Sequence, residues 1–165
     1  MEITLRMYSD EIHKPLLDNY VMTSNYYTDT PKEVALKAQD DLNRFPIMIQ
    51  NEKEELIGFF CLHINDGPKL YGFTGKEYGL IRGYSIDERF QNKGVASNSF
   101  KNIFEFIDRE ISTDLKRLVL GVNVGNFAAQ KAYHKAGFHR LPISLEGRVG
   151  PLVIMELENK HHPSL

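Results

Sequence analysis

The chain has 165 residues, and its 20 Lys and Arg against 22 Asp and Glu give a formal net charge of −2. This length predicts one domain, and a content of 42% hydrophobic and 25% charged residues is typical of globular rather than disordered proteins. Near-neutral charge argues against a nucleic-acid-binding module, because such modules attract phosphates with excess positive charge. We therefore expect a single domain over residues 1–165 that has no nucleic-acid partner.

The single cysteine, Cys61, excludes a disulfide framework and a multi-cysteine zinc site. No apolar run reaches the roughly 20 residues that span a bilayer. Residues 1–6 lack the basic and apolar regions of a secretory signal. We expect a cytoplasmic protein that has no membrane association and binds no metal.

The first forty residues predict a strand and two helices. Residues 3–6 alternate apolar and polar side chains, which is typical of a half-buried strand. Ser9 can cap a following helix, which Pro15 keeps short. In residues 30–33, a threonine cap, a proline at the first helical position and an acid three residues after the cap predict a helix over 31–42.

The middle of the chain predicts a hairpin between two irregular segments. Residues 45–50 and 56–64 are β-rich apolar runs separated by a polar turn, which indicates an antiparallel hairpin. Residues 20–29 are aromatic and polar without periodicity, and residues 66–76 contain three glycines and a proline. We expect both of these segments to be connections.

The second half alternates strands and helices, which implies at least one crossover between parallel neighbours. Apolar side chains from residue 96 to residue 111 recur at helical spacing, with polar side chains on the opposite face. The elements expected in order are a strand over 79–86, a helix from residue 96, a strand over 118–124, a helix over 126–136, a short strand near residue 138, a strand over 152–157 and a loose tail over 158–165.

Residues 91–96 form a glycine-containing loop between a predicted strand and an amphipathic helix. The N–H groups that begin a helix point outward with a partial positive charge, and the small residues Gly94 and Ala96 let an anion approach the backbone. With Lys93 and Arg89 adding positive charge, the loop predicts a phosphate or pyrophosphate site, although a plain strand-to-helix turn has the same pattern. The sequence contains neither the P-loop of nucleotide hydrolases nor the glycine fingerprint of dinucleotide enzymes.

The segment 126–138 is the second candidate. Asn126, Ala129 and Tyr133 lie on one helical stripe, because steps of three and four residues stay on one face. Asn126 can cap the helix, and Gly137 can end it in a left-handed conformation. A capped amphipathic helix with Tyr133 as a half-buried core aromatic is the alternative interpretation.

The pattern Gln91-x-x-Gly94-x-Ala96 is followed, after a predicted strand, by Asn126-x-x-Ala129-x-x-x-Tyr133-x-x-x-Gly137-Phe138. Together the two patterns resemble the GNAT superfamily of N-acetyltransferases, and the resemblance covers residues 79–138. It implies an α/β fold with a central twisted mixed sheet, whose fourth and fifth strands splay apart, flanked by about four helices. It also implies that acetyl-CoA binds in that cleft as the acetyl donor, and Ala96 replaces the second glycine of the loop, as the family pattern allows.

The resemblance also implies roles for individual residues. Tyr133 is expected near the thioester sulfur, as the general acid that protonates the departing CoA thiolate. The loop is expected to hold the pyrophosphate. The backbone groups of the preceding strand, near Tyr84 and Ile86, are expected to bind the pantetheine arm. The expected donor-binding residues are Tyr84, Ile86, Gln91, Asn92, Lys93, Gly94, Val95, Ala96, Ser97, Asn126 and Ala129.

The acceptor is expected to be a primary amine of a small molecule, which attacks the acetyl carbonyl directly. Because about one such amine in a thousand is neutral at pH 7, a base or a water-relayed proton path would help. The candidates for this general base are Glu77, His63 and a water relay. We expect segments 20–29 and 66–76 to build the acceptor pocket, in which aromatic rings and Asp29 could hold the amine. Polyamines, aminoglycosides, amino acids and peptide N-termini all stay open.

Two alternatives concern the chemistry. Cys61 alternates with His63 on an apolar strand and is interpreted as a buried apolar side chain, although a ping-pong acyl-enzyme would use such a cysteine. The domain could also bind acetyl-CoA as a sensor or partner module without turnover. Tyr133 favours the enzyme, because CoA binding alone needs no phenol beside the sulfur. Many members of the family are dimers, so a homodimer is also open.

Overall fold

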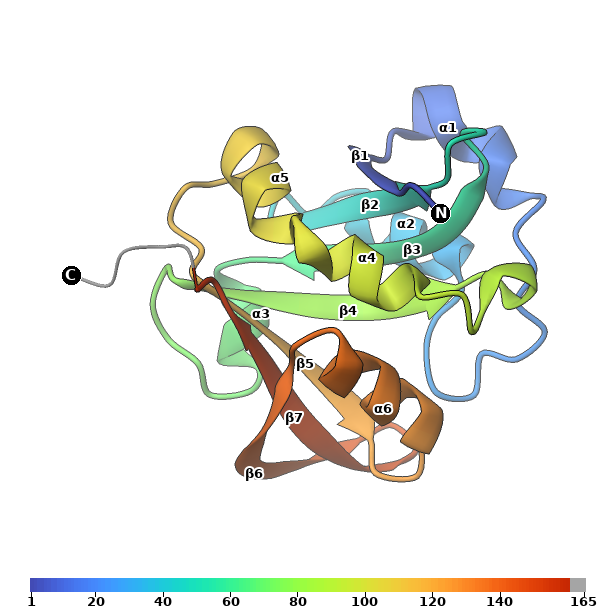
Figure 1. Cartoon of the computed structure of the whole chain (residues 1–165). Coiled ribbons are helices and arrows are strands. Elements are labelled where there is room, and N and C mark those ends of the chain that lie inside the picture. Colours follow the sequence, from blue (N-terminus) through green and yellow to red (C-terminus); the bar gives the residue numbers. More distant parts are fainter. Residues whose placement is uncertain (161–165) are drawn as a thin grey trace.

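The computed structural model describes residues 1–160, which form a seven-stranded mixed sheet with helices on both faces (Figure 1). The strands are β1 (Thr4–Met7), β2 (Arg44–Gln50), β3 (Leu56–His63), β4 (Tyr78–Ile86), β5 (Arg117–Asn123), β6 (His139–Gly147) and β7 (Gly150–Glu158). The helices are α1 (Asp10–Leu17), α2 (Pro31–Ala38), α3 (Asp66–Lys69), α4 (Val95–Lys101), α5 (Ile103–Glu110) and α6 (Phe127–Lys135), with one 3₁₀ turn at Glu88–Phe90. The strand order is β1-β2-β3-β4-β5-β7-β6, and only β4 and β5 are parallel neighbours.

β4 and β5 are hydrogen-bonded to each other at one end only. Their register joins Tyr78–Leu80 to Arg117–Val119, and beyond these residues the two strands part. β5 pairs along its full length with β7 instead. The expected mixed sheet and the splay between its fourth and fifth strands are therefore confirmed.

The pairing of β3 with β4 is irregular beside this gap. The register between β3 and β4 shifts between Phe59 and Cys61. Across from this bulge, Gly83 of β4 has a φ of +60°, and a Cβ there would lie 2.5 Å from Cγ2 of Val34. The glycine therefore serves both the left-handed backbone and the close approach of α2 to β4.

Three helices differ from the sequence expectation, and one of them, α3, lies in segment 66–76, which was expected to be a connection. The long helix expected from residue 96 is divided at Asn102, whose φ of −120° and ψ of 24° separate α4 from α5. The helix expected over 31–42 begins at Pro31 with its capping box but ends at Ala38. Beyond its end, the Asp41 carboxylate accepts the N–H of Asn43 at 2.9 Å in a turn that leads into β2.

The C-terminal part is more regular than expected. β6 is a nine-residue strand rather than a short one, because it pairs with β7 to form the edge of the sheet. The tail does not loosen at residue 158, since Glu158 belongs to β7 and the N–H of Asn159 donates to the carbonyl of Lys116 at 2.9 Å. Residues 161–165 lie outside the described part of the chain.

The larger core lies between the sheet and helices α4, α5 and α6 (Figure 1). Its aromatic rings contact one another across these elements: Phe100 stacks on Tyr84 at 5.0 Å and meets Phe138 edge-on at 4.9 Å between ring centroids. A smaller core lies between the other face and helices α1 and α2. Among residues 1–160, no helix combines the length and the apolar character needed to cross a membrane.

The connection between α1 and α2, residues 20–29, is tied to the end of β4. The Tyr20 hydroxyl is 2.7 Å from Ser85 Oγ, and the N–H of Val21 donates to Asp87 Oδ2 at 2.9 Å. The Asp87 carboxylate is fully buried and also accepts bonds from the side chain and N–H of Arg89. Burial alone would raise the pKa of Asp87, but these hydrogen bonds together hold it below its ordinary value.

We expect Asp87→Asn to lower the free energy of unfolding by about 2 kcal/mol at pH 7, because it removes charged hydrogen bonds from a buried site. The folded-state pKa of Asp87 is depressed, so its contribution is present at neutral pH and is lost as the pH falls below about 4. Urea unfolding of both proteins at several pH values measures this. The exposed Asp108→Asn is the matched control, and an equal difference at pH 3 and pH 7 would contradict the assignment.

Candidate active site

A large pocket of about 810 Å³ opens on the sheet face that carries α4 and α6. The end of β4, the loop before α4, one side of α6 and the 20–29 segment form its wall. Tyr133 and every residue expected to bind the donor line this pocket, with the exception of Lys93. The expected donor-binding residues that line it are Tyr84, Ile86, Gln91, Asn92, Gly94, Val95, Ala96, Ser97, Asn126 and Ala129.

The loop before α4 presents its backbone to the large pocket. Asn92 and Gly94 have left-handed φ values of 61° and 77°, and a Cβ at Gly94 would meet nothing within 4 Å. Gln91 Nε2 donates to the carbonyl of Ile86 at 3.2 Å, which ties the loop to β4. Because the first N–H groups of a helix have no acceptor within it, this loop offers several backbone donors at one place.

The positive charges of the large pocket differ from the expected ones. Arg89 is bound to Asp87 and to the carbonyl of Asn19, and the Lys93 ammonium lies 5.8 Å from the centroid of the Phe90 ring. Neither Arg89 nor Lys93 lines the pocket. The lining cations are two lysines of α6 that the motif analysis missed, and their i, i+4 spacing on that helix was the available signal. They are Lys131 and Lys135.

Helix α6 brings Tyr133 to the gap between β4 and β5. Asn126 Oδ1 accepts the N–H of Ala129 at 3.3 Å, so the expected cap is present. Tyr133 is 9% exposed, and its ring meets that of Tyr84 edge-on at 5.7 Å. Within residues 1–160 its hydroxyl makes no hydrogen bond, and burial raises its pKa well above the ordinary value. The phenol therefore stays protonated at neutral pH.

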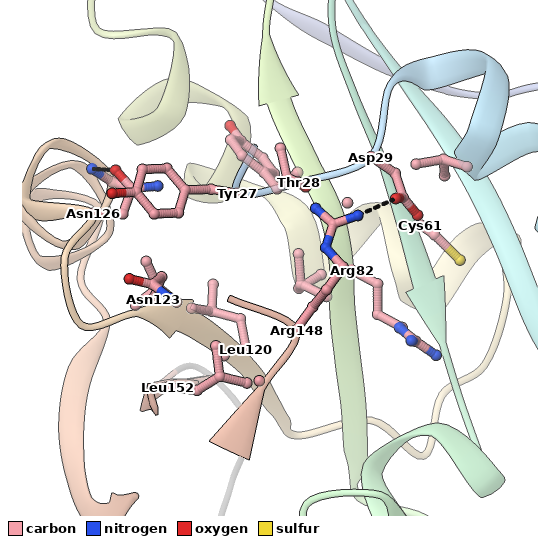
Figure 2. Close-up of a pocket in the computed structure, with 18 of the residues that line it drawn as sticks. Tyr27, Thr28, Asp29, Cys61, Arg82, Leu120, Asn123, Asn126, Arg148 and Leu152 are labelled. Atoms are coloured by element: carbon pink, nitrogen blue, oxygen red, sulfur yellow. Dashed lines mark hydrogen bonds and ion pairs between the residues drawn. The ribbon is translucent and has the colours of Figure 1, made fainter. Parts of the chain in front are cut away.

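A small pocket of about 310 Å³ lies on the opposite face of the sheet, beside α2. It contains residues from β2, β3, β4, β5 and the loop between β6 and β7 (Figure 2). The two pockets meet at the gap between β4 and β5, where they share lining residues. The shared residues are Tyr27, Thr28, Tyr84, Asn126, Ala129 and Tyr133.

One acidic residue, Asp29, lines the small pocket, and it is already paired. Its carboxylate is 2.7 Å from Lys37 Nζ and 3.8 Å from Arg148 Nη1, and Figure 2 shows the guanidinium reaching it from the β6–β7 loop. Arg148 also donates to the backbone carbonyls of residues 25 and 26. Segments 20–29 and 66–76, which the sequence predicts at the acceptor pocket, both contribute to this pocket, the second through Tyr71.

The two side chains considered as bases line neither pocket. His63 is 2% exposed, and its ring nitrogens are 2.9 Å from Asp66 Oδ1 and 3.2 Å from Arg82 Nη1. Burial lowers the pKa of His63 although Asp66 opposes this. Glu77 precedes β4 at the end where β4 and β5 are joined, so it lies away from the gap.

Cys61 lines the small pocket but is only 3% exposed. Burial raises the pKa of its thiol to about 11. Because the thiolate is the nucleophilic form, this environment disfavours the acyl-enzyme alternative.

Three side chains near the small pocket have the composition of a metal site. Ligand atoms of Asp41, His63 and Asp66 lie within 4.8 Å of one another. Asp41 accepts from Arg44 Nε at 3.2 Å, and both ring nitrogens of His63 already have partners. The polar atoms of this cluster are therefore satisfied by protein groups.

Solved structures of several acetyltransferases share this fold. An aminoglycoside acetyltransferase AAC(6')-Ib, in complex with coenzyme A and kanamycin, has a TM-score of 0.73 at 17% identity and covers 96% of each chain. A spermidine N-acetyltransferase SpeG chimera from Vibrio cholerae and hSSAT has a TM-score of 0.65 at 19% identity, covering 96% of this chain and 97% of that chain. A structure described as a putative phosphinothricin N-acetyltransferase has a TM-score of 0.60 at 15% identity, covering 97% and 100%. At these identities the likeness shows the fold alone.

A search of curated protein sequences finds no match. The model of the acetyltransferase (GNAT) family matches residues 11–138, which is most of the chain and includes both motifs. The chain therefore belongs to the acetyltransferase (GNAT) family of N-acetyltransferases, as its two motifs predict.

Proposed function

We propose that this protein transfers the acetyl group of acetyl-CoA to a primary amine of a small molecule by direct attack. The observation that carries this proposal is the meeting of two pockets from opposite faces of the sheet at Tyr133, in the gap between β4 and β5. One pocket suits the long donor and the other a small acceptor. Structures of the similar aminoglycoside acetyltransferase hold acetyl-CoA or coenzyme A, which supports the same donor here.

In this proposal the large pocket binds the donor. The backbone N–H groups of residues 91–97 hold the pyrophosphate, and Lys131 and Lys135 bind the remaining phosphate of CoA. The pantetheine arm lies along β4 near Tyr84 and Ile86, because the backbone groups on this edge have no partner in β5. Asn126 and Ala129 line the other side of the arm.

Acetyl-CoA supplies the acetyl group as a thioester, whose C–S bond breaks as the amine nitrogen forms the new N–C bond. The attacking nitrogen loses a proton to water as the amide forms, and Tyr133 donates its phenolic proton to the departing thiolate and regains one from solvent. The ammonium of the acceptor must lose its proton first. Since neither His63 nor Glu77 lines either pocket, we propose that water relays this proton to bulk. The single catalytic domain, the cytoplasmic location and a homodimer stay predictions.

The first test is thermal unfolding with and without acetyl-CoA, with CoA and NAD as further ligands. Acetyl-CoA at 100 times its dissociation constant should stabilise the protein by about 2.7 kcal/mol, and NAD should not.

Ser97→Glu places a negative charge at the proposed pyrophosphate site and should weaken acetyl-CoA binding about tenfold or more. The neighbouring Asn98→Glu lies outside the pocket and is the matched control. No shift at millimolar acetyl-CoA would overturn the donor site.

Tyr133→Phe should keep the acetyl-CoA thermal shift and lose about 10²- to 10⁴-fold in kcat, measured by release of the CoA thiol. The hydroxyl makes no hydrogen bond within residues 1–160, so we expect little change in folding stability. The exposed Tyr26→Phe is the control, because Tyr26 lines neither pocket. Unchanged turnover would remove Tyr133 from the mechanism. Binding of acetyl-CoA without turnover of any amine would favour a sensor or partner module.

The pH dependence tests the protonation states. For an alkylamine acceptor, kcat/KM should rise with pH from 6 towards 10, because the neutral fraction of the amine rises. It should show no descending limb below about pH 10, since burial raises the pKa of Tyr133 and keeps the acid protonated. Initial rates at constant ionic strength measure this profile. A fall centred below pH 9 would contradict the assigned acid.

A further inference from the structure

The small pocket has a surplus of positive charge. Four cationic side chains line it against one carboxylate, that of Asp29. Asp29 is shared by two of the cations, and a third is paired with Asp41, an acid just outside the pocket, at 3.2 Å. The lining cations are Lys37, Arg44, Arg82 and Arg148.

Arg82 is the cation without a carboxylate. In the part of the chain that the structure describes, no acidic oxygen lies within 4.0 Å of its guanidinium. Its one side-chain partner there is His63 Nδ1, at 3.2 Å. Arginine can only donate, so Nδ1 accepts, and the other ring nitrogen donates to Asp66. His63 therefore orients Arg82 as a neutral ring and leaves its charge uncompensated.

The position of Arg82 is fixed by the sheet. It stands opposite Cys61 in the register of β4 with β3, and directly opposite residues of antiparallel strands share a face. Arg44 stands opposite His63, two residues further along β3, so both guanidinium groups belong to the same face. Figure 2 shows Arg82 and Cys61 together on the wall of the pocket that lies away from Asn126. A ligand can thus meet Arg82 at one end and the β4–β5 gap at the other.

Polycations suit this pocket poorly. A polyamine or an aminoglycoside would bring several ammonium groups to a wall with surplus positive charge, and Asp29 is already bound to Lys37 and Arg148. The volume of about 310 Å³ is also near the lower end of small-molecule sites. An acceptor with one amine and one anionic group matches both the charge and the size.

We propose that the acceptor is a small amino acid, whose carboxylate or equivalent phosphinate binds Arg82 while its amine points to the gap at Tyr133. The planar guanidinium suits either anion, because each offers two oxygens for paired hydrogen bonds. Arg82 is then the residue that determines acceptor specificity. This inference rests on the proposed function, and it deepens that function by naming the substrate class.

Matched acceptors test the proposal. Thiol release is measured with 4-aminobutyrate against butylamine, with leucine and phenylalanine against their amides, and with phosphinothricin, spermidine and kanamycin. In at least one pair, we expect kcat/KM for the compound with the carboxylate to be about tenfold or more above that for the compound without it. Phosphinothricin carries a phosphinate in addition to its α-carboxylate, so a kcat/KM above those of leucine and phenylalanine would indicate that the phosphinate is recognised. Equal kcat/KM within every pair, or a preference for spermidine, kanamycin or the partners that lack a carboxylate, would overturn the proposal.

A binding measurement covers the case in which no compound in the panel turns over. Thermal unfolding in the presence of saturating CoA should then show that the amines with a carboxylate or phosphinate stabilise the protein. Their matched compounds without an acidic group should not. If no amine that carries a carboxylate or phosphinate stabilises the protein in this assay, the proposal is also overturned. A failure of the proposed donor site can be distinguished from this outcome, because acetyl-CoA alone would then produce no thermal shift.

Arg82→Met retains an unbranched side chain as far as the ε position and removes the guanidinium and its charge. We expect it to raise KM for the acidic acceptor about 10- to 100-fold and to abolish the preference within the pair, with the acetyl-CoA shift retained. Arg82→Lys keeps the charge and should restore part of the preference, which separates recognition from folding. The exposed Arg109→Met on α5 is the matched control and should change neither quantity. A preference that survives in Arg82→Met would contradict the assignment.

Discussion

The early parting of β4 and β5 is the constraint on which the rest of the structure depends. The strands are joined from Tyr78 to Leu80, and β5 then follows β7 instead. A sheet that stayed closed would separate its two faces completely, because each backbone N–H and C=O would be used by a neighbour. The gap leaves one edge of β4 unpaired and connects the large pocket with the small one. Tyr133 lines both pockets at this gap with a buried phenol.

The same parting explains why the two pockets differ in character. The large pocket is formed by the start of one helix and the side of another, so backbone donors and lysines are available to an extended anionic molecule. The small pocket is lined by side chains from adjacent strands, where register determines which residues face the same way. Its chemistry therefore depends on individual side chains such as Arg82 and Asp29 rather than on helix ends.

Features governed by local sequence could be predicted. The loop at residues 91–97 and the cap and stripe of α6 depend on residues within a few positions of one another, and the structure brings nearly all of them to one pocket. The proline-started α2 and the β2–β3 hairpin follow from similarly local signals. The division of the helix at Asn102 was missed because apolar spacing continues across it.

Features that depend on distant residues could not be predicted. Arg82, Arg148 and Asp29 come from separate parts of the chain, and nothing in their local sequence marks them as neighbours. His63 looked like a base because of its ordinary pKa, but Asp66 and Arg82 occupy both of its nitrogens. Lys93 lies in the loop and Arg89 shortly before it, yet their side chains turn to Phe90 and Asp87.

The 20–29 segment has a further consequence. It is anchored at its beginning to Ser85, Asp87 and Glu88, while Tyr27 and Thr28 further along it form part of both pocket walls. A molecule that repositions this shared wall from one side changes the surface that the other side offers. Thermodynamic linkage makes such an effect mutual, so under the proposed function any change that the donor causes in the acceptor's affinity is matched by an equal change in the donor's own affinity. Cooperativity between the two substrates would then arise from the wall that they have in common.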